Sequence, residues 1–303
     1  MASVFTTIFN AIRLAITKWF LNLASIFGFQ QSIESIINLN TKPVKNREIE
    51  RILREFPNDR ISELDWDTGD ETEAAEEILN ESIRDSEKRY DLSKNMARSM
   101  RQIRGYKKLC AKVETRRLEA YNPLDDEHEI GLRKLWALLK PDEKLQARKT
   151  QQWQDIGFQG DDPATDFRGM GVLGLDQLVF FAQFDVDNCN HVFKLSQHPK
   201  YGFPFAICGI AMTATTKELL FDNMLKNHFY NAFRESPTID SFHQVYCRVF
   251  KLFADFWEMS RPESVMEFSL IRNDFEMMLE KYLDREDANL IDVTLPRMIE
   301  ETL

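Results

Sequence analysis

Cysteine is scarce in this chain of 303 residues, and its four copies form no CxxC pair. A disulfide framework is therefore not indicated, and the cysteine usage fits a reducing, cytosolic compartment. Cys189, His191, His198 and Cys208 lie within one short stretch, but their spacing matches no zinc pattern. Free cysteine is commonly a small buried apolar residue. We therefore expect no metal and no cofactor.

Basic charge is also in short supply. The chain has 39 Lys and Arg against 49 Asp and Glu, which gives a net charge of -10. The charge of the whole chain therefore repels nucleic acid, and only a local basic patch would bind phosphate or anionic lipid. Hydrophobic residues, in contrast, make up 43% of the chain and aromatic residues 12%, with 23 Phe. This composition supplies a packed core and excludes disorder throughout.

Signals for β-structure are few. The chain contains no Asn-Gly or Asp-Gly hairpin turn and no sustained alternation of polar and β-branched residues. Apolar residues instead recur at helical spacing along most of the chain. We expect an all-α fold, with helices over residues 40–61, 94–117, 127–139, 142–156, 173–184, 189–196, 205–224, 239–259 and 265–284.

Composition divides the chain into three parts. Residues 1–28 are largely apolar, and residues 29–120 form an N-terminal helical region. That region contains an acidic segment, 62–87, which we interpret as a loop followed by a solvated helix. The main helical domain is predicted over residues 121–290, after a hinge near Tyr121–Pro123.

Residues 94–117 reverse the sign of the charge, because Lys and Arg there greatly outnumber the single Glu114. Apolar residues from Met96 to Val113 repeat at helical spacing within the same stretch. A basic amphipathic helix of this kind either contacts anionic lipid or an acidic partner, or packs its apolar stripe and leaves its charges in water. The second arrangement is the commoner one in soluble proteins.

The first 28 residues have an apolar face at helical spacing. The residues on that face are Phe5, Ile8, Ile12, Ile16, Trp19, Leu23 and Ile26. Arg13 and Lys18 interrupt the apolar run. A signal peptide carries its positive charge before the run, so that interpretation is not favoured. A membrane-spanning helix would place Arg13 near the middle of the bilayer, which costs about 2.5–3.5 kcal/mol. We expect a helix lying in the headgroup region of a membrane; the alternative is an amphipathic helix docked on the protein's own body.

A loop from Gly157 to Gly171 (GFQGDDPATDFRGMG) lies between two predicted helices. Its four glycines and one proline demand special backbone geometry, and loops held by rigid helices are where function concentrates. Residues 169–174 match the dinucleotide pattern G-x-G-x-x-G, but that pattern needs a preceding strand, and none is predicted. No GxxxxGK[ST] motif occurs, so the chain is predicted to be neither a GTPase nor a kinase.

Residue types alone leave a structural interpretation of this loop open. Asp166 would cap the following helix, and Pro163 would shape the turn. Arg168 would pair with Asp161 or Asp162, an exposed ion pair worth less than about 1 kcal/mol.

A functional interpretation comes from a resemblance. The stretch from Trp153 to Leu175 closely resembles the signature of ELMO domains, and the resemblance extends more loosely over Tyr106–Asp284. The matching positions are Trp153, Gly157, Phe158, Gln159, Gly160, Pro163, Thr165, Asp166, Phe167, Arg168, Gly169, Gly171 and Leu175. The motif is long and specific, and the first hundred residues match much more weakly.

The resemblance implies a function. Small ELMO-domain-containing proteins act as GTPase-activating proteins for Arf and Arf-like GTPases, and their motif holds an essential arginine at the position of Arg168. Arg168 is then an arginine finger offered to the GTP-bound partner, the other motif residues support the loop, and the chain itself is expected not to be an enzyme. Among the supporting residues, Trp153, Phe158 and Phe167 are expected to anchor the loop to the helical body.

Large ELMO proteins suggest an alternative, because they are scaffolds that join a Rac exchange factor. A non-catalytic adaptor that binds a small GTPase or its exchange factor at a membrane would carry the same motif. With either function we expect a cytoplasmic protein that is peripherally associated with an intracellular membrane through its N-terminal helix. No nucleic-acid partner is expected.

Overall fold

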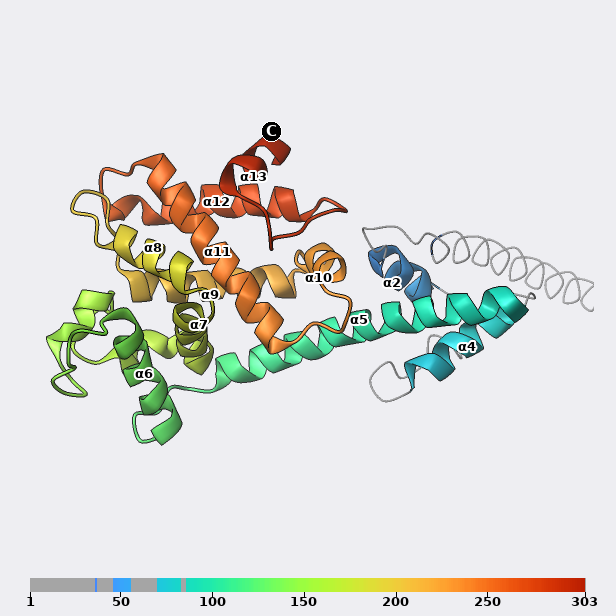
Figure 1. The fold of residues 1–303 in the computed structure, drawn as a ribbon, viewed down its shortest axis with the longest axis horizontal. Coiled ribbons are helices and arrows are strands. Elements are labelled where there is room, and N and C mark those ends of the chain that lie inside the picture. The colour runs from blue at the N-terminus through green and yellow to red at the C-terminus, as the bar shows by residue number, and fades with distance from the viewer. Residues whose placement is uncertain (1–35, 37–45, 56–69, 83–85, 303) are drawn as a thin grey trace, which may run out of the picture. The chain divides into compact units, whose positions relative to one another are not determined.

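The computed structural model describes residue 36 and residues 46–55, 70–82 and 86–302. Every regular element within these residues is a helix, so the all-α prediction is confirmed for the described part of the chain (Figure 1). No helix among these residues is long and apolar enough to cross a membrane. The apolar face predicted between Phe5 and Ile26, with Arg13 and Lys18, lies outside the described residues.

The chain forms two compact units. The first comprises Met1–Gly105 and Arg234–Ser236, and the second comprises the rest of the chain. The division falls within the long helix α5 (Ser86–Leu118). The hinge predicted near Tyr121–Pro123 lies inside the second unit.

In the first unit, α2 (Asn46–Glu55) and α4 (Glu71–Ser82) are tied to the N-terminal part of α5. The Asn46 amide donates to the Gln102 side chain at 2.5 Å, and Arg104 Nη1 lies 2.7 Å from Glu71 Oε1. The buried apolar residues of these helices include Ile49, Ala75, Ile78, Leu79, Leu92, Met96, Met100 and Ile103. The helix in the acidic segment is thus solvated only on its acidic side, since its apolar side is buried.

The basic stretch predicted over 94–117 lies within α5. Its apolar stripe is buried, as at Met96 and Val113, while Lys107 and Lys108 are exposed. This is the arrangement in which a helix packs its apolar stripe and leaves most of its charges in water.

In the second unit, α7 (Gly171–Phe184) and α11 (Ile239–Ser260) form the centre. Helix α7 packs against α6 (Asp126–Leu139), α8 (Val186–Ser196), α9 (Phe205–Phe221) and α11, and α11 packs in turn against α8 and α9. Figure 1 shows α11 crossing this group of helices. Helices that are apolar on nearly every side, as α7 and α9 are, are expected to be buried over most of their surface.

The remaining short elements of this unit are η1 (Gln151–Ile156), η2 (Pro163–Arg168), α10 (Lys226–Ala232) and η3 (Val265–Glu267). The C-terminal helices α12 (Phe268–Leu283) and α13 (Leu295–Thr302) pack against each other and against α11. Helix α13 was not predicted from the sequence.

Residues 142–156 are not an α-helix, and that prediction is wrong. After α6 the chain passes Pro141 and continues irregularly until the 3-10 helix η1. The Trp136 indole donates to the Glu143 carbonyl at 2.7 Å. A carbonyl engaged by a tertiary partner shows that packing, not local propensity, determines the course of this segment.

Candidate functional site

The loop from Gly157 to Gly171, here the arginine loop, contains the 3-10 helix η2. Asp162 caps η2, because its Oδ1 accepts from the Ala164 amide at 3.1 Å. Pro163 occupies the start of the helix and is buried. An acidic cap followed by proline is a favourable start for a helix, because proline has no amide to leave unsatisfied.

Further hydrogen bonds close the arginine loop on itself. Asp166 does not cap the following helix; its Oδ2 accepts from the backbone amide of Gln159 at 3.0 Å. Thr165 Oγ1 donates to the Asp162 carbonyl at 3.2 Å. Gln159 and Thr165 are themselves exposed. The polar residues of the motif therefore shape the loop through its own backbone.

A chain of five aromatic rings, here the aromatic base, lies beneath the loop. The ring-centroid distances are 5.6 Å for Trp136–Trp153, 5.9 Å for Trp153–Phe158, 5.6 Å for Phe158–Phe167 and 5.2 Å for Phe167–Tyr121. The three motif aromatics are at most 3% exposed. Aromatic pairs at such separations add stability beyond their burial. Trp153, Phe158 and Phe167 are therefore buried between the arginine loop and the helical body, which is the position expected of residues that anchor the loop.

Two glycines of the motif have positive φ. Gly157 has φ 88°, and a Cβ there would lie 2.2 Å from the Phe205 nitrogen. Gly171 has φ 54°, and a Cβ there would lie 2.2 Å from the Arg117 carbonyl oxygen. No other residue fits either position without moving backbone. Gly160 and Gly169, in contrast, have open space where a Cβ would stand.

Arg148, which the sequence did not single out, holds the start of η2. Its Nε donates to Glu129 of α6, and its Nη1 donates to Asp162 Oδ1 at 2.9 Å. Lys149 Nζ also lies 2.9 Å from Asp162 Oδ2. Burial alone would raise the pKa of Asp162, but the hydrogen bonds from Lys149, the η2 backbone and Arg148 hold that pKa below its usual value. Asp162 is therefore a charged anchor of the loop.

Arg168 is the last residue of η2 and is exposed. Its Nε donates to the Thr165 carbonyl at 2.8 Å, which orients the side chain. Within the described part of the chain, its guanidinium has no carboxylate at ion-pair distance, and neither Asp161 nor Asp162 pairs with it. The outer nitrogens of the guanidinium therefore remain available to a partner.

The end of α5 is bound to the start of α7 beside the loop. Arg116 forms a two-point contact with Asp176, at 2.5 Å from Nε and 3.0 Å from Nη2, and also pairs with Glu119 at 2.6 Å. The hydrogen bond from Arg116 is the main reason that the pKa of Glu119 is lowered. Arg117 Nη1 donates to the Gly169 carbonyl at 3.4 Å. These contacts fix the arginine loop at its C-terminal end.

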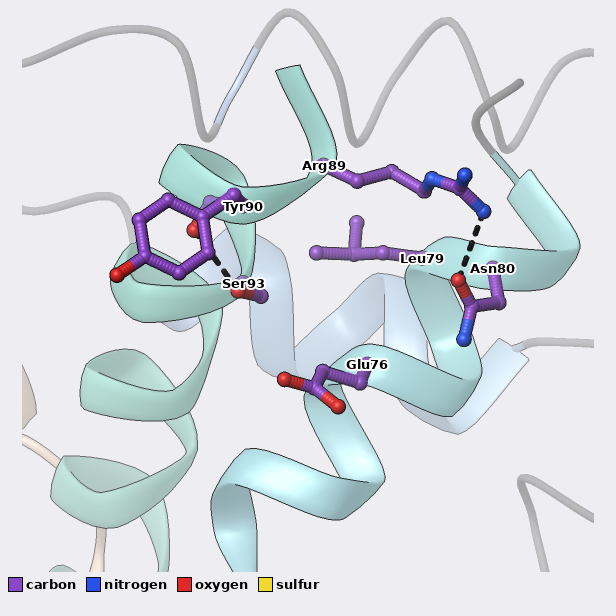
Figure 2. Close-up of a pocket in the computed structure, with 6 residues that line it drawn as sticks. All are labelled: Glu76, Leu79, Asn80, Arg89, Tyr90 and Ser93. Carbon is purple, nitrogen blue, oxygen red and sulfur yellow. Dashed lines mark hydrogen bonds between the residues drawn. The ribbon is translucent and has the colours of Figure 1, made fainter. Parts of the chain in front are cut away.

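Hollows among the described residues include one in each unit. One, of about 220 Å³, lies in the first unit between α4 and α5 (Figure 2). Its cation, Arg89, donates to the Asn80 side chain at 2.8 Å, and Ser93 donates to the Tyr90 carbonyl. Arg89 and Ser93 thus already bond to neighbouring groups of the lining. The second hollow, of about 280 Å³, borders α7 in the second unit.

The histidines and cysteines considered for metal binding have different surroundings. Cys189 and Cys208 are buried, while His191 lies 3.6 Å from Asp255 and His198 stacks on Tyr201. Among the described residues no group of three or more His, Cys, Asp or Glu side chains is arranged to hold a metal ion.

Comparison of the sequence with known proteins identifies the family of this chain. The family model of the ELMO/CED-12 family matches residues 111–272, which include the whole arginine loop. This chain belongs to the ELMO/CED-12 family. It is 43% identical over 206 residues to ELMO domain-containing protein 2 of Mus musculus, covering 68% of this chain and 70% of that protein. No solved structure matches the chain.

Two further relatives widen the comparison. The chain is 36% identical over 274 residues to ELMO domain-containing protein 1 of Bos taurus, with 83% of each protein covered. It is also 36% identical over 190 residues to ELMO domain-containing protein B of Dictyostelium discoideum, covering 63% of this chain and 66% of that protein. The resemblance identified from the motif is thereby confirmed.

One expectation is corrected at this point. The sequence led us to expect that the chain is not an enzyme. The relatives are named for their ELMO domain, and a domain name excludes no enzymatic activity, so that conclusion does not hold.

Proposed function

We propose that this ELMO-domain protein is a GTPase-activating protein for an Arf-family or Arf-like small GTPase, with Arg168 as its arginine finger. The observation that supports this proposal is the state of the Arg168 guanidinium: it is exposed, oriented by one backbone hydrogen bond, and unpaired with any carboxylate among the described residues. Its remaining donors are therefore free to bond to oxygens of a partner.

The chemistry of GTP hydrolysis suits such a group. Negative charge develops on the transferring γ-phosphoryl group and on the leaving oxygen, and a planar guanidinium with several donors bridges two such oxygens. Supplied in trans, an arginine finger accelerates hydrolysis by about 10³ to 10⁵-fold. The Nη1 and Nη2 donors of Arg168 are the ones that would meet these oxygens.

The rigidity of the loop supports the same proposal. A finger is effective only when its position is set before the partner arrives, because a loose side chain loses conformational entropy on binding. Gly157, Gly171 and the aromatic base fix the backbone on both sides of Arg168, and Arg148 fixes the start of η2.

The test is single-turnover GTP hydrolysis by a panel of purified Arf and Arf-like GTPases, with and without the full chain. At least one member should hydrolyse GTP faster with the parent protein, and Arg168→Ala should abolish the acceleration. Arg133→Ala removes another exposed arginine of the same unit and should behave as the parent does. Binding without acceleration would replace this proposal by the scaffold alternative.

We also propose that the protein works in the cytoplasm at an intracellular membrane, with the apolar N-terminal face as its anchor. The support is the sequence pattern from Phe5 to Ile26. Ile12→Asp with Trp19→Asp should abolish co-flotation with liposomes and leave the activity on a soluble GTPase nearly unchanged. Misfolding or aggregation of that variant would show instead that the segment belongs to the protein core.

A further inference from the structure

The hollow of about 280 Å³ lies between α6, α7 and α11 of the second unit. The apolar part of its lining includes Val172 and Leu175, which are buried, and Val179 and Phe180, which are half-buried. Next to it, Phe184 stacks on Phe180 at 4.9 Å and remains 57% exposed. The surface therefore offers apolar area that the fold leaves uncovered.

Uncompensated negative charge rims this hollow. Glu127 and Asp240 line it, are exposed, and form no ion pair among the described residues. The one cation of the lining, Arg116, is already bound to Asp176 and Glu119. The two free carboxylates stand in the first turns of α6 and α11, where the helix dipole tolerates them. The rim is complementary to a basic group.

His243 of α11 also lines the hollow. It is 7% exposed, its ring lies 5.1 Å from that of Phe180, and its Nδ1 has no hydrogen-bond partner. Burial lowers the pKa of His243 to about 4, so the ring is neutral at physiological pH. The Nδ1 atom is itself inaccessible to solvent, so the ring contributes to the lining through its contact with Phe180 and not as a hydrogen-bonding group.

The hollow lies close to the arginine loop. Val172 follows Arg168 by four residues, which span at most about 14 Å. A standard protein–protein interface buries about 800 Å² on each partner, a patch about 30 Å across. A globular partner that meets Arg168 is therefore large enough to reach the hollow as well.

We propose that this hollow docks an apolar side chain, flanked by a basic residue, of the GTP-bound small GTPase that Arg168 serves. The inference rests on the proposed function and assigns to that function its binding surface. Arg168 acts on the reacting phosphate, and the hollow, with Glu127 and Asp240 at its rim, sets affinity and partner choice.

The experiment measures binding and hydrolysis in parallel. The full chain is titrated against each GTPase of the panel loaded with a non-hydrolysable GTP analogue, and single-turnover hydrolysis is recorded at saturating protein. The variants are Glu127→Lys with Asp240→Lys, and Val179→Asp for the apolar surface. Asp126→Lys is the matched control, because Asp126 is also exposed in the first turn of α6 but does not line the hollow.

Glu127→Lys with Asp240→Lys should raise Kd by at least about tenfold at low salt, because rim charges attract a complementary partner. The difference should shrink at high salt, because salt screens the interaction between exposed charges. Turnover at saturation should stay within about twofold of the parent, since ground-state binding alone has changed. Val179→Asp should weaken binding at both salt concentrations. Asp126→Lys should bind as the parent does, and melting temperatures identify any variant that fails to fold.

Each of the other outcomes contradicts either the docking surface, the proposed function or both. If the parent accelerates hydrolysis and the rim variants bind as tightly as the parent, the docking surface is wrong and the proposed function stands. If the parent binds without acceleration and the rim variants lose binding, the surface stands and the arginine finger does not. If the parent neither binds nor accelerates, both are wrong. Loss of self-association in the variants, with GTPase binding unchanged, would show a second copy of this chain to be the occupant instead.

Discussion

The base and the tip of the arginine loop have opposite designs. At the base, Trp153, Phe158 and Phe167 are nearly fully buried, and Gly157 meets neighbouring backbone with no room for a side chain. At the tip, Arg168 is exposed and no carboxylate pairs with it among the described residues. Residues of one motif thus differ in their surroundings: those of the base are packed into the fold, and Arg168 at the tip is exposed.

The contrast between base and tip shows that the residues of one motif have different roles. Most of its residues are there for geometry, since they are buried, bonded to their own loop or required by positive φ. A site residue is distinguished from them by what it does not contact. The comparison makes four predictions, because base and tip should respond to substitution in different measurements.

The largest effect is expected at the tip. Arg168→Ala should lower stimulated GTP hydrolysis by at least about 10³-fold, because a finger contributes when transition-state charge develops. Its free energy of unfolding should stay within about 1 kcal/mol of the parent, because an exposed side chain contributes little to folding. Single-turnover kinetics and urea denaturation measure the two quantities.

Arg168→Lys sharpens this test. It should restore little activity, because a point charge does not reproduce the two-point geometry of a guanidinium. With GDP and aluminium fluoride, the parent should form a tighter complex with the GTPase than the Ala variant does. A folded Arg168→Ala protein with parental activity would remove the finger from consideration.

The next effect is expected at the base. Trp153→Ala should lower the free energy of unfolding by about 3–5 kcal/mol, the usual cost of deleting a buried large aromatic side chain. Activity should fall with it, since Trp153 supports Phe158 in the aromatic base. Thermal and urea unfolding give the size of the effect. Leu124→Ala, which shortens a side chain that is 90% exposed, serves as the control.

Lost activity with unchanged stability would move Trp153 from the base to the partner interface.

Gly157→Ala should cost about 2–4 kcal/mol of unfolding free energy, because a positive φ and a contact with the Phe205 backbone must both be accommodated. Gly169→Ala has open space around its Cβ and should change stability by less than about 1 kcal/mol. Circular dichroism melting curves of the two variants compare base and tip at the same residue type. Equal effects at the two positions would contradict the division described above.

The smallest effect is expected between base and tip. Arg148→Met leaves Asp162 and Glu129 with one cation fewer and should cost about 1–3 kcal/mol, as for hydrogen bonds to charged groups. Lys149→Met removes a side chain that is 68% exposed and should cost less than about 0.5 kcal/mol. Urea denaturation of both variants at neutral pH tests the difference. If Lys149→Met is the more damaging, Arg148 does not hold the loop.

The fold class and the site motif were predictable because both depend on the local order of residue types along the chain. Helical periodicity predicted α6, α7, α11 and α12 closely, and glycine with proline marked the arginine loop. The same periodicity failed over residues 142–156. There, tertiary bonds such as Trp136 to the Glu143 carbonyl replace the helical bonds that the spacing suggests.

By itself, the sequence determined that this protein is all-α, that it belongs with ELMO-domain proteins, and that Arg168 stands in the motif. Tertiary structure alone decided which charges are free. From the sequence alone, Asp162 was a possible partner of Arg168. The fold instead brings Arg148 to Asp162 from outside the motif, and no carboxylate of the described residues pairs with Arg168. Neighbours in the sequence are possible partners. The fold, here through the bonds of Arg148 to Glu129 of α6 and to Asp162, determines which of them come within hydrogen-bond distance.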